Sequence, residues 1–453
     1  MPEKHHIPGP FGPPRGRVEA GRKPESKPEL WALVDCACFY CSCERLFRPD
    51  LKDKPVVVLS NNDGGIVAIS PEAKELGFKR GDLYFKKEKE LKAAGVAVFS
   101  SNYALYGDIS RRVVQTMESV APVVLQYSID EAFVPFNRTL ALSATEVGQV
   151  LYDRVRSWVG VPVRVGLGPT RTLAKFANHW AKKLSGVLAL EAGSPLLAEL
   201  LAKSPPGDVW GMGRRSAAKL EKRGIDTALK LRDMDPLEAG KLLSVTGRRT
   251  VMELRGIQCV TDDLSPSFRR TMVSSRSFGT KITDPEALAA AVAGHAATAA
   301  ERLRKEGLTA LGLTVFIETS RFGRDPFQGG ASIELKSPTS SALELVAAAK
   351  KALASCHAPG KLYAKCGIML HDLFSAEEAR RMDGTLFGGD ERERTEGLMG
   401  AMDQINRKYG KKTVRLAAEA GKKAYWDLRR DNLSRISTTD FDLLPLVSAG
   451  RGR

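Results

Sequence analysis

Residues 30–190 alternate between short apolar runs and longer amphipathic stretches. Short runs rich in β-branched residues are typical of buried strands, and apolar residues three or four apart are typical of helices. The pattern predicts strands at residues 30–35, 54–59, 66–69 and 161–167, and helices at residues 70–76, 103–120, 145–159 and 170–184. Alternating strands and helices of this kind indicate an α/β layer.

Two adjacent acids, Asp130 and Glu131, interrupt an apolar stretch that is typical of a strand–turn–strand hairpin. Side chains alternate along a strand, so we expect a tight turn to bring both carboxylates to one site. Asp35 ends another apolar run. Acids are rarely found within apolar sequence of this kind unless they are paired or bind a cation. Three carboxylates at strand ends match the oxygen ligands that two hard cations need for nucleotidyl transfer. Because the acids lie on hairpin-like neighbours, a mixed or antiparallel sheet is favoured over a doubly wound one.

A change of character near residue 190 indicates short helices and turns. Gly211 and Gly213 form a Gly-x-Gly pair between two predicted helices, the second at residues 216–223, and Arg214 and Arg215 follow directly. Backbone N–H groups at a helix N-terminus bind phosphate, so this helix-hairpin-helix is a candidate contact to a nucleic-acid backbone. The alternative is an ordinary helical turn.

A second α+β segment follows a Ser/Pro-containing linker. Its predicted order is strand, helix, strand, strand, helix, strand, at residues 273–280, 285–305, 311–319, 332–335, 341–354 and 363–373. This β-α-β-β-α-β order is that of a ferredoxin-like split module. A helix at residues 395–408 and a basic tail come after it, and the tail is a candidate contact to DNA or a partner protein or else merely a solubilising segment.

The length of 453 residues predicts about three or four domains, and the net charge of +16 favours polyanionic partners. No apolar run approaches the roughly 20 residues of a membrane span, and the N-terminal segment, expected to be a disordered basic arm, lacks the apolar core of a secretory signal. We therefore expect a protein of the reducing cytoplasm without a membrane partner.

Seven cysteines include a cluster of four, at Cys36, Cys38, Cys41 and Cys43. An odd count with this clustering does not indicate a secreted disulfide framework. The C-x-C-x2-C-x-C spacing also differs from paired zinc knuckles. We interpret these cysteines as small buried hydrophobic residues, with a zinc or iron–sulfur site as the alternative.

Several motifs together resemble UmuC-type Y-family DNA polymerases. They lie at residues 35–44, 55–64, 100–106, 127–133, 208–213 and 426–440, in the order of that family, and the similarity runs from Trp31 to about Leu444. The resemblance implies an α+β right-hand polymerase with palm, small fingers, helical thumb and split βαββαβ little finger. It implies template-directed, error-prone synthesis past damaged bases in an SOS-type response.

The implied domain boundaries follow from the same resemblance. They are an arm at 1–29, palm at 30–45 and 100–190, fingers at 46–99, thumb at 191–262, linker at 263–271, little finger at 272–375 and a basic C-terminal extension at 376–453.

The resemblance also assigns roles to single residues. Asp35, Asp130 and Glu131 fall where the family binds two Mg²⁺ ions, and the backbone carbonyl of Cys36 is an implied further ligand. Tyr40 matches the steric gate that excludes a ribose 2′-hydroxyl, with a half-buried core tyrosine as the alternative.

Two lysines, Lys74 and Lys175, match residues that meet the incoming dNTP triphosphate, where fixed positive charge stabilises the developing charge. A solvated helix lysine is the alternative for either one.

Two departures from the family pattern concern its contacts. Ile69 precedes Ser70-Pro71 where relatives often have Arg, which predicts a changed nucleotide affinity or lesion preference. The clamp-binding peptide Gln-Leu-x-Leu-Phe is replaced at 383–387, where Leu386 and Phe387 remain as candidates and the Gln is missing. Implied partners are primed and damaged DNA, a UmuD-like dimer, a RecA filament and the sliding clamp, in a bacterial, nucleoid-associated setting.

Three alternatives stay open at this point. The acids form an exposed turn with no catalytic role, the chain is a silent Y-family-like scaffold that supports another polymerase, or it is a cysteine-ligated metalloprotein that senses redox state. Retention of three clustered acids argues against the scaffold, because such a cluster is costly without cations.

Overall fold

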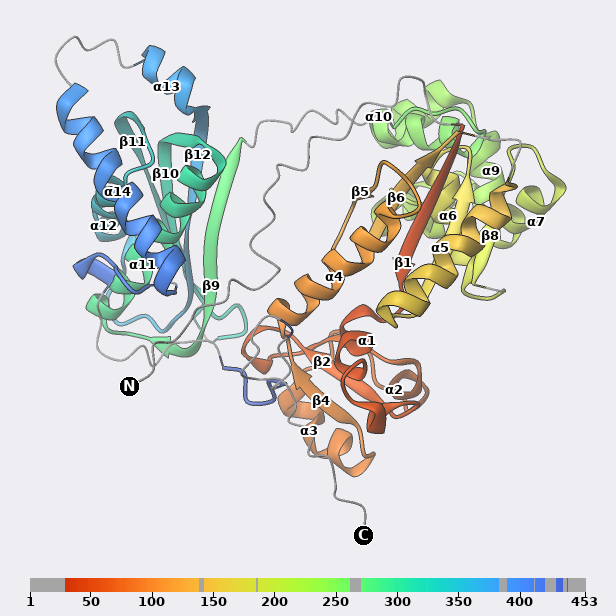
Figure 1. Cartoon of the computed structure of the whole chain (residues 1–453), viewed down its shortest axis with the longest axis horizontal. Coiled ribbons are helices and arrows are strands. Elements are labelled where there is room, and N and C mark those ends of the chain that lie inside the picture. Colours follow the sequence, from red (N-terminus) through yellow and green to blue (C-terminus); the bar gives the residue numbers. More distant parts are fainter. Residues whose placement is uncertain are drawn as a thin grey trace, which may run out of the picture. The chain divides into compact units, whose positions relative to one another are not determined.

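The structure, a computed structural model, describes residues 29–137, 142–184, 186–260, 270–323, 325–382, 389–410, 412–419, 429–434 and 438. The chain forms two compact units (Figure 1). Unit 1 comprises residues 1–60, 64–265 and 432–453, and unit 2 comprises residues 61–63 and 266–431. Most of the predicted arm, most of the linker and the candidate clamp residues Leu386 and Phe387 lie outside the described residues.

A five-stranded sheet with the order β5-β6-β1-β7-β8 forms the centre of unit 1. Its strands are β1 (Leu30–Cys36), β5 (Leu125–Gln126), β6 (Glu131–Phe136), β7 (Val163–Gly168) and β8 (Val187–Ala189). β1 pairs antiparallel with β6 and β7, whereas β7 and β8 are parallel. The predicted mixed sheet is therefore confirmed.

The alternation of side chains along β1 separates the two faces of this sheet. Val34 packs in the large core that includes residues of α4 (Tyr103–Glu118) and α5 (Ala144–Val159). Leu33 points to the other face, against Ala174 of α6 (Arg171–Ala181). Asp35, two residues beyond Leu33, shares the α6 face because side chains repeat every second residue.

A close approach of α6 to β7 depends on Gly166. A Cβ atom at this position would lie 2.1 Å from the backbone nitrogen of Asn178 and 2.3 Å from the carbonyl oxygen of Ala174. Both obstacles are backbone atoms, so only glycine lets the helix lie this near the strand.

A smaller sheet with the order β3-β2-β4 lies next in the chain. It contains β2 (Val56–Leu59), β3 (Ile66–Ile69) and β4 (Ala97–Ser100), with α1 (Phe39–Arg45), α2 (Pro71–Glu75) and α3 (Tyr84–Ala93) beside it in sequence. The predicted helix after Ser70 is confirmed: Ser70 caps α2, Pro71 is its first residue and Gly77 follows at φ 89°. β4 is an edge strand that the hydrophobic pattern did not predict.

Helices α7 (Pro195–Lys203), α8 (Arg214–Glu221), α9 (Ala228–Asp233) and α10 (Pro236–Leu254) enclose a separate hydrophobic core. Gly211 and Gly213 lie between α7 and α8, as predicted, with the 3₁₀ turn Pro206–Asp208 before them. Helix α8 begins at Arg214, two residues before the predicted start.

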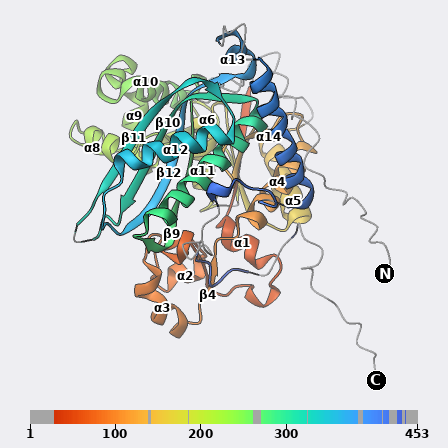
Figure 2. The same ribbon diagram turned by 90° about the vertical axis from the view of Figure 1, so that its left-hand side faces the viewer.

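Unit 2 has the predicted β-α-β-β-α-β order. The elements are β9 (Thr271–Ile282), α11 (Pro285–Glu306), β10 (Leu308–Thr319), β11 (Gln328–Thr339), α12 (Ala342–Cys356) and β12 (Tyr363–Ser375). The strand order is β11-β10-β12-β9, so each helical connection passes over one strand. Figure 2 shows α11 and α12 side by side over one face of this sheet, where their alanine-rich sides form the core.

Two helices follow this module, α13 (Ala376–Met382) and α14 (Gly389–Tyr409). Arg304 of α11 forms a bidentate ion pair with Asp403 of α14, with both N–O distances 2.7 Å. Among the described helices, none is long and apolar enough to cross a membrane.

Candidate active site

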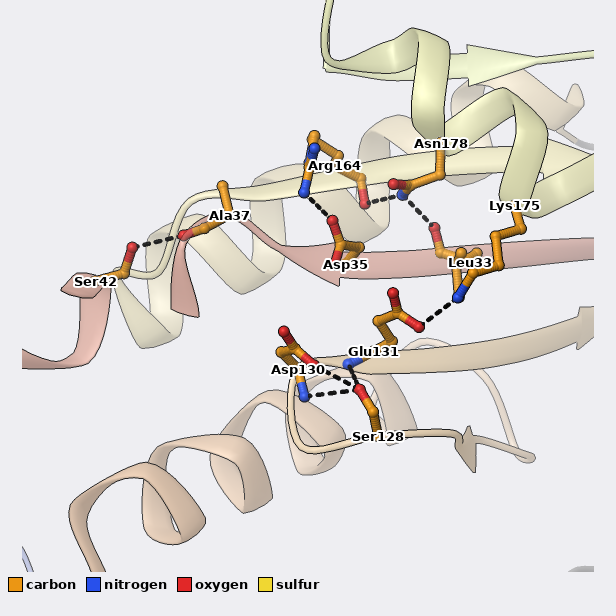
Figure 3. A network of polar contacts seen from close by, with 10 residues as sticks. All are labelled: Leu33, Asp35, Ala37, Ser42, Ser128, Asp130, Glu131, Arg164, Lys175 and Asn178. Atoms are coloured by element: carbon orange, nitrogen blue, oxygen red, sulfur yellow. Dashed lines mark hydrogen bonds and ion pairs between the residues drawn. The ribbon is translucent and has the colours of Figure 1, made fainter. Parts of the chain in front are cut away.

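The hairpin strands bring two of the predicted acids opposite each other. Asp35 on β1 and Glu131 on β6 are direct cross-strand partners, and the Cys36 N–H donates to the Asp130 carbonyl over 2.8 Å. Directly opposite residues of an antiparallel pair place their side chains on one face. Asp35 and Glu131 therefore face the same space beside α6 (Figure 3).

The third acid is held by the turn before β6. The Ser128 hydroxyl donates to the Asp130 carboxylate over 2.5 Å and accepts from the N–H groups of Asp130 and Glu131, over 3.2 and 3.0 Å. This serine turn lets adjacent acids occupy the same end of the sheet. Asp130 also contributes to raising the pKa of Asp35, so the two charges are near each other.

Two cations neutralise the facing acids. Arg164 of β7, the cross-strand neighbour of Asp35 on its other side, forms an ion pair with Asp35. Lys175 of α6 forms one with Glu131, with an N–O distance of 2.6 Å. Burial raises the pKa of Asp35 to about 6, and the neighbouring Arg164 opposes that rise while Glu131 adds to it.

A bound ion would require a rearrangement of these side chains. Within the described ranges, no group of three or more Asp, Glu, His or Cys side chains is close enough to hold a metal ion as the side chains stand. Asp35 and Glu131 are engaged by their cations, and Asp130 is engaged by Ser128. The structure thus brings the predicted acids to one end of the sheet without forming a ligand shell.

Tyr40 lies on α1, directly after the end of β1 that carries Asp35. Its ring stacks on Tyr106 with centroids 4.4 Å apart and meets Tyr103 edge-on at 6.1 Å. Burial raises the pKa of Tyr40, and the charges of Tyr103 and Asp130 add to the rise. The predicted gate residue is therefore half-buried and held by two tyrosines of α4 that the sequence analysis left without a role.

Lys74 is exposed on α2. Within the described part of the chain, the ion pairs of Asp35 and Glu131 are made by Arg164 and Lys175 and do not include Lys74. Of the two predicted triphosphate lysines, Lys175 is therefore the one already placed beside a predicted acid.

A cavity of about 520 Å³ extends from Glu131 to the glycine pair. Its wall includes Glu131, Arg164 and Lys175 on one side and Gly211 and Gly213 on the other. Arg214 and Arg215 begin α8 directly after this wall and are exposed. The lining also includes the carboxylate of Asp208, so its charges are mixed. Backbone N–H groups at the start of α8 are the feature of this wall that favours an anion.

Two aromatic rings lie beside Lys175. Trp210 meets Tyr127 edge-on with centroids 5.6 Å apart, and the Lys175 ammonium lies 4.7 Å from the Tyr127 ring centroid. Cation–π contacts and the ion pair together hold Lys175 beside Glu131.

The cysteine cluster packs as the sequence analysis expected. Cys36, Cys41 and Cys43 are buried free thiols in the hydrophobic core, and Cys38 is half-buried against it. Burial raises the pKa of the three buried thiols, which disfavours the thiolate that zinc or iron would bind.

Three contributors to the site were missed by sequence reasoning. Arg164 could have been found as a single charge inside the apolar run 161–167, by the argument used for Asp35. Ser128 could have been found as turn chemistry before the acids. Asn178, which donates to the carbonyls of Leu33 and Arg164 over 3.2 and 3.0 Å, carries no sequence signal because only the packing of α6 brings it there.

Comparison with known proteins identifies this arrangement. Residues 34–179 match the impB/mucB/samB family, residues 269–384 match the C-terminal domain of that family, and residues 396–447 match a domain of unknown function, DUF4113. A solved Y-family DNA polymerase chimera, Dbh-Dpo4(243-245)-Dbh, is similar in fold over 76% of this chain and 99% of its own, with a TM-score of 0.60 and 17% identity. The fold is therefore that of a Y-family DNA polymerase.

Relatives of known name are closer in sequence. Protein ImpB of Salmonella typhimurium is 40% identical over 93% of this chain and 100% of its own, and Protein UmuC of Salmonella typhimurium strain LT2 is 40% identical over 92% and 99%. DNA polymerase IV 1 of Bacillus subtilis is 26% identical over 85% of this chain and 92% of its own. The chain belongs to the impB/mucB/samB family, the UmuC-type Y-family DNA polymerases.

Proposed function

We propose that this DNA polymerase performs template-directed, error-prone synthesis past damaged bases in an SOS-type response, by two-metal nucleotidyl transfer. The observation that carries the proposal is the cross-strand pair of Asp35 and Glu131, with Asp130 adjacent, at one end of the central sheet. This is an accumulation of negative charge next to a cavity that suits phosphate groups.

The residues fit two Mg²⁺ ions by their chemistry. Hard oxygen donors, which Mg²⁺ prefers, are offered by Asp35, Asp130, Glu131 and the carbonyl of Cys36. Arg164 and Lys175 already balance the negative charge of Asp35 and Glu131, so positive charge is favourable at this place. Bound ions would supply the positive charge that activates the primer hydroxyl and offsets charge on the triphosphate.

The remaining residues bind and orient the substrates. The Tyr40 ring is the proposed surface against the dNTP sugar, and Lys175 and Lys74 are the proposed triphosphate contacts. The backbone N–H groups at Gly211 and Gly213 are the proposed contacts to the DNA backbone, which would hold DNA without reading its sequence.

Primer extension on undamaged and abasic templates, with Mg²⁺ and all four dNTPs, tests the proposal. We expect the wild type and the Asp153→Ala control, an exposed acid of α5, to extend the primer, and Asp130→Ala to lose at least about 100-fold in rate. Absence of primer extension by the wild type, even with UmuD-like protein and RecA filaments added, would overturn the proposed polymerase function.

A second candidate function, a silent scaffold that supports another polymerase, is favoured by one observation. Arg164 and Lys175 neutralise Asp35 and Glu131 with side chains of the chain itself, so the acids do not require ions for stability. A scaffold predicts equal, absent extension by the wild type and Asp130→Ala together with retained binding of primed DNA.

The finer assignments are also proposals. We assign the palm, fingers, thumb and little finger to the ranges expected from the sequence, and a UmuD-like dimer, a RecA filament and the sliding clamp as partners in the bacterial cytoplasm. They are supported by the similarity to Protein UmuC, and co-precipitation of each purified partner tests them.

A further inference from the structure

The segment formed by residues 432–434 and Thr438, here called the strap, lies against unit 1. It belongs to the stretch that matches a domain of unknown function, residues 396–447. The same stretch begins in unit 2, where α14 is held by the ion pair between Arg304 and Asp403. This stretch therefore makes a second, separate contact through the strap, within unit 1, which also carries the three acids.

The backbone of the strap continues the small sheet. Leu433 forms a parallel bridge with Ser100, the last residue of the edge strand β4. The Ser100 N–H donates to the Asn432 carbonyl over 2.9 Å, and the Asn432 N–H donates to the Ser100 hydroxyl over 3.0 Å. Ser100 is fully buried, so the strap covers an edge that would otherwise be open to pairing.

The side chains of the strap reach two helices. The Ser434 hydroxyl accepts from the Asn102 side chain, which caps α4, over 3.0 Å, and donates to the Glu44 carboxylate of α1 over 3.3 Å. The Thr438 hydroxyl donates to Asp108 of α4 over 2.6 Å. The four residues of the strap thus contact β4, α1, the residue that caps α4 and the first half of α4.

Glu44 connects the strap to the tyrosine pair. Its fully buried carboxylate uses one oxygen, Oε1, to accept both from Ser434 and from the Tyr106 hydroxyl, which lies 2.7 Å away. The other oxygen, Oε2, has no hydrogen-bond partner within the described ranges. Ser434 is therefore one of two donors that hold this carboxylate, and the ring that the carboxylate fixes, Tyr106, is the one on which Tyr40 stacks.

We propose that the strap positions the Tyr40–Tyr106 pair for selection of the nucleotide sugar, with Ser434 as a positioning residue that acts through Glu44. The proposal rests on the proposed polymerase function and assigns an intramolecular role to the end of the domain of unknown function. A buried carboxylate that loses a donor must move toward another one, and the Tyr106 ring moves with it. Once displaced, the Tyr40 and Tyr106 rings no longer stay at a fixed distance from the sugar of the incoming nucleotide.

Hydrogen–deuterium exchange of the full chain tests docking without any activity. The variant Asn432→Pro/Ser434→Ala/Thr438→Val removes one backbone and two side-chain donors of the strap. We expect the Ser100 amide to exchange at least about 10-fold faster than in the wild type, because its acceptor is released. Unchanged exchange at Ser100 would overturn docking of the strap.

Single-nucleotide insertion kinetics test the positioning role. We expect Ser434→Ala to lower the preference for dNTP over rNTP by roughly 3- to 10-fold, the factor for one ordinary hydrogen bond, mainly through KM. Ser434→Thr keeps the hydroxyl and is expected to restore the preference. Ser157→Ala, at an exposed serine of α5 whose hydroxyl donates to the Asp153 carbonyl of the same helix, is the matched control.

The outcomes separate the two proposals. An inactive wild type overturns the polymerase function, while hydrogen exchange still decides docking. The positioning role is overturned if the strap docks but Ser434→Ala keeps the wild-type preference for dNTP over rNTP. It is also overturned if Ser434→Ala lowers kcat equally for both nucleotides. Either result leaves the polymerase function standing. Faster exchange in the triple variant together with the altered preference in Ser434→Ala supports both steps.

Discussion

At the residue scale, Arg164 and Lys175 offset the negative charge of two of the clustered acids. Each cation contacts one carboxylate, and Arg164 opposes the rise in the Asp35 pKa that burial causes. An arginine beside a proposed metal ligand lowers the local affinity for cations, because like charges repel.

If the proposed magnesium ions bind these acids, replacing Arg164 should change the Mg²⁺ concentration that the enzyme needs. We expect Arg164→Gln to lower the Mg²⁺ concentration for half-maximal insertion by about 3- to 10-fold at pH 8, above the Asp35 pKa of about 6. Arg156→Gln, an exposed arginine of α5, should leave it unchanged. A magnesium titration at saturating dNTP checks this, and an unchanged or raised requirement would contradict it.

His295 of α11 predicts a pH dependence of stability. Burial lowers its pKa to about 4, and Arg276, Lys412 and Arg302 add to the shift. The unfolded chain therefore binds this proton more readily than the folded protein does. The contribution of neutral His295 to the free energy of unfolding is complete above pH 6.5 and is lost as the pH falls toward 4, by at most about 3 kcal/mol. We expect His295→Gln to flatten the urea-unfolding free energy between these values. An equally steep dependence in the variant would place its origin elsewhere.

At the scale of elements, the hydrophobic pattern predicted α4, α5, α11 and α12 and the strands β9, β10 and β12 to within a few residues. It missed the long helix α10, and it placed β11 correctly but four residues too short at each end. β4 and α3 were missed, since β4 is a short edge strand and α3 is a mostly charged, largely exposed helix, so neither carries a clear apolar period.

The contact between β7 and α6 depends on one glycine and provides a stability test. We expect Gly166→Ala to lower the free energy of unfolding by more than about 3 kcal/mol, because its Cβ would overlap backbone atoms of α6. Gly107→Ala in α4, where a Cβ meets nothing within 4 Å, should instead stabilise by about 0.5–1 kcal/mol. Urea unfolding of both variants checks the pair, and a Gly166→Ala protein as stable as the wild type would refute the steric argument.

At the scale of the whole molecule, the net charge of +16 favours binding to the phosphates of DNA. Arg214 and Arg215 are exposed directly after the glycine pair that borders the cavity. Contacts to phosphate release counterions, so their number sets the slope of affinity against salt.

Removing both arginines should therefore weaken binding to primed DNA independently of its sequence. We expect Arg214→Ala/Arg215→Ala to reduce the slope of log affinity against log salt by about 2. Lys350→Ala/Lys351→Ala, two exposed lysines of α12, keeps the same net charge and controls for the general field. Fluorescence anisotropy over a salt series measures both slopes, and equal slopes for the two variants would show that charge alone matters.

The sequence by itself determined the α+β class, the split module, the burial of the cysteines and the three acids at strand ends. These follow from local periodicity, and acids inside apolar runs are visible without any partner. The tertiary structure decided which groups meet those acids. The pairing of Asp35 with Arg164, the place of Asn178 and the contact of Ser434 with Glu44 join residues 129, 145 and 390 positions apart. Such contacts depend on sheet register and helix packing, which no local pattern specifies.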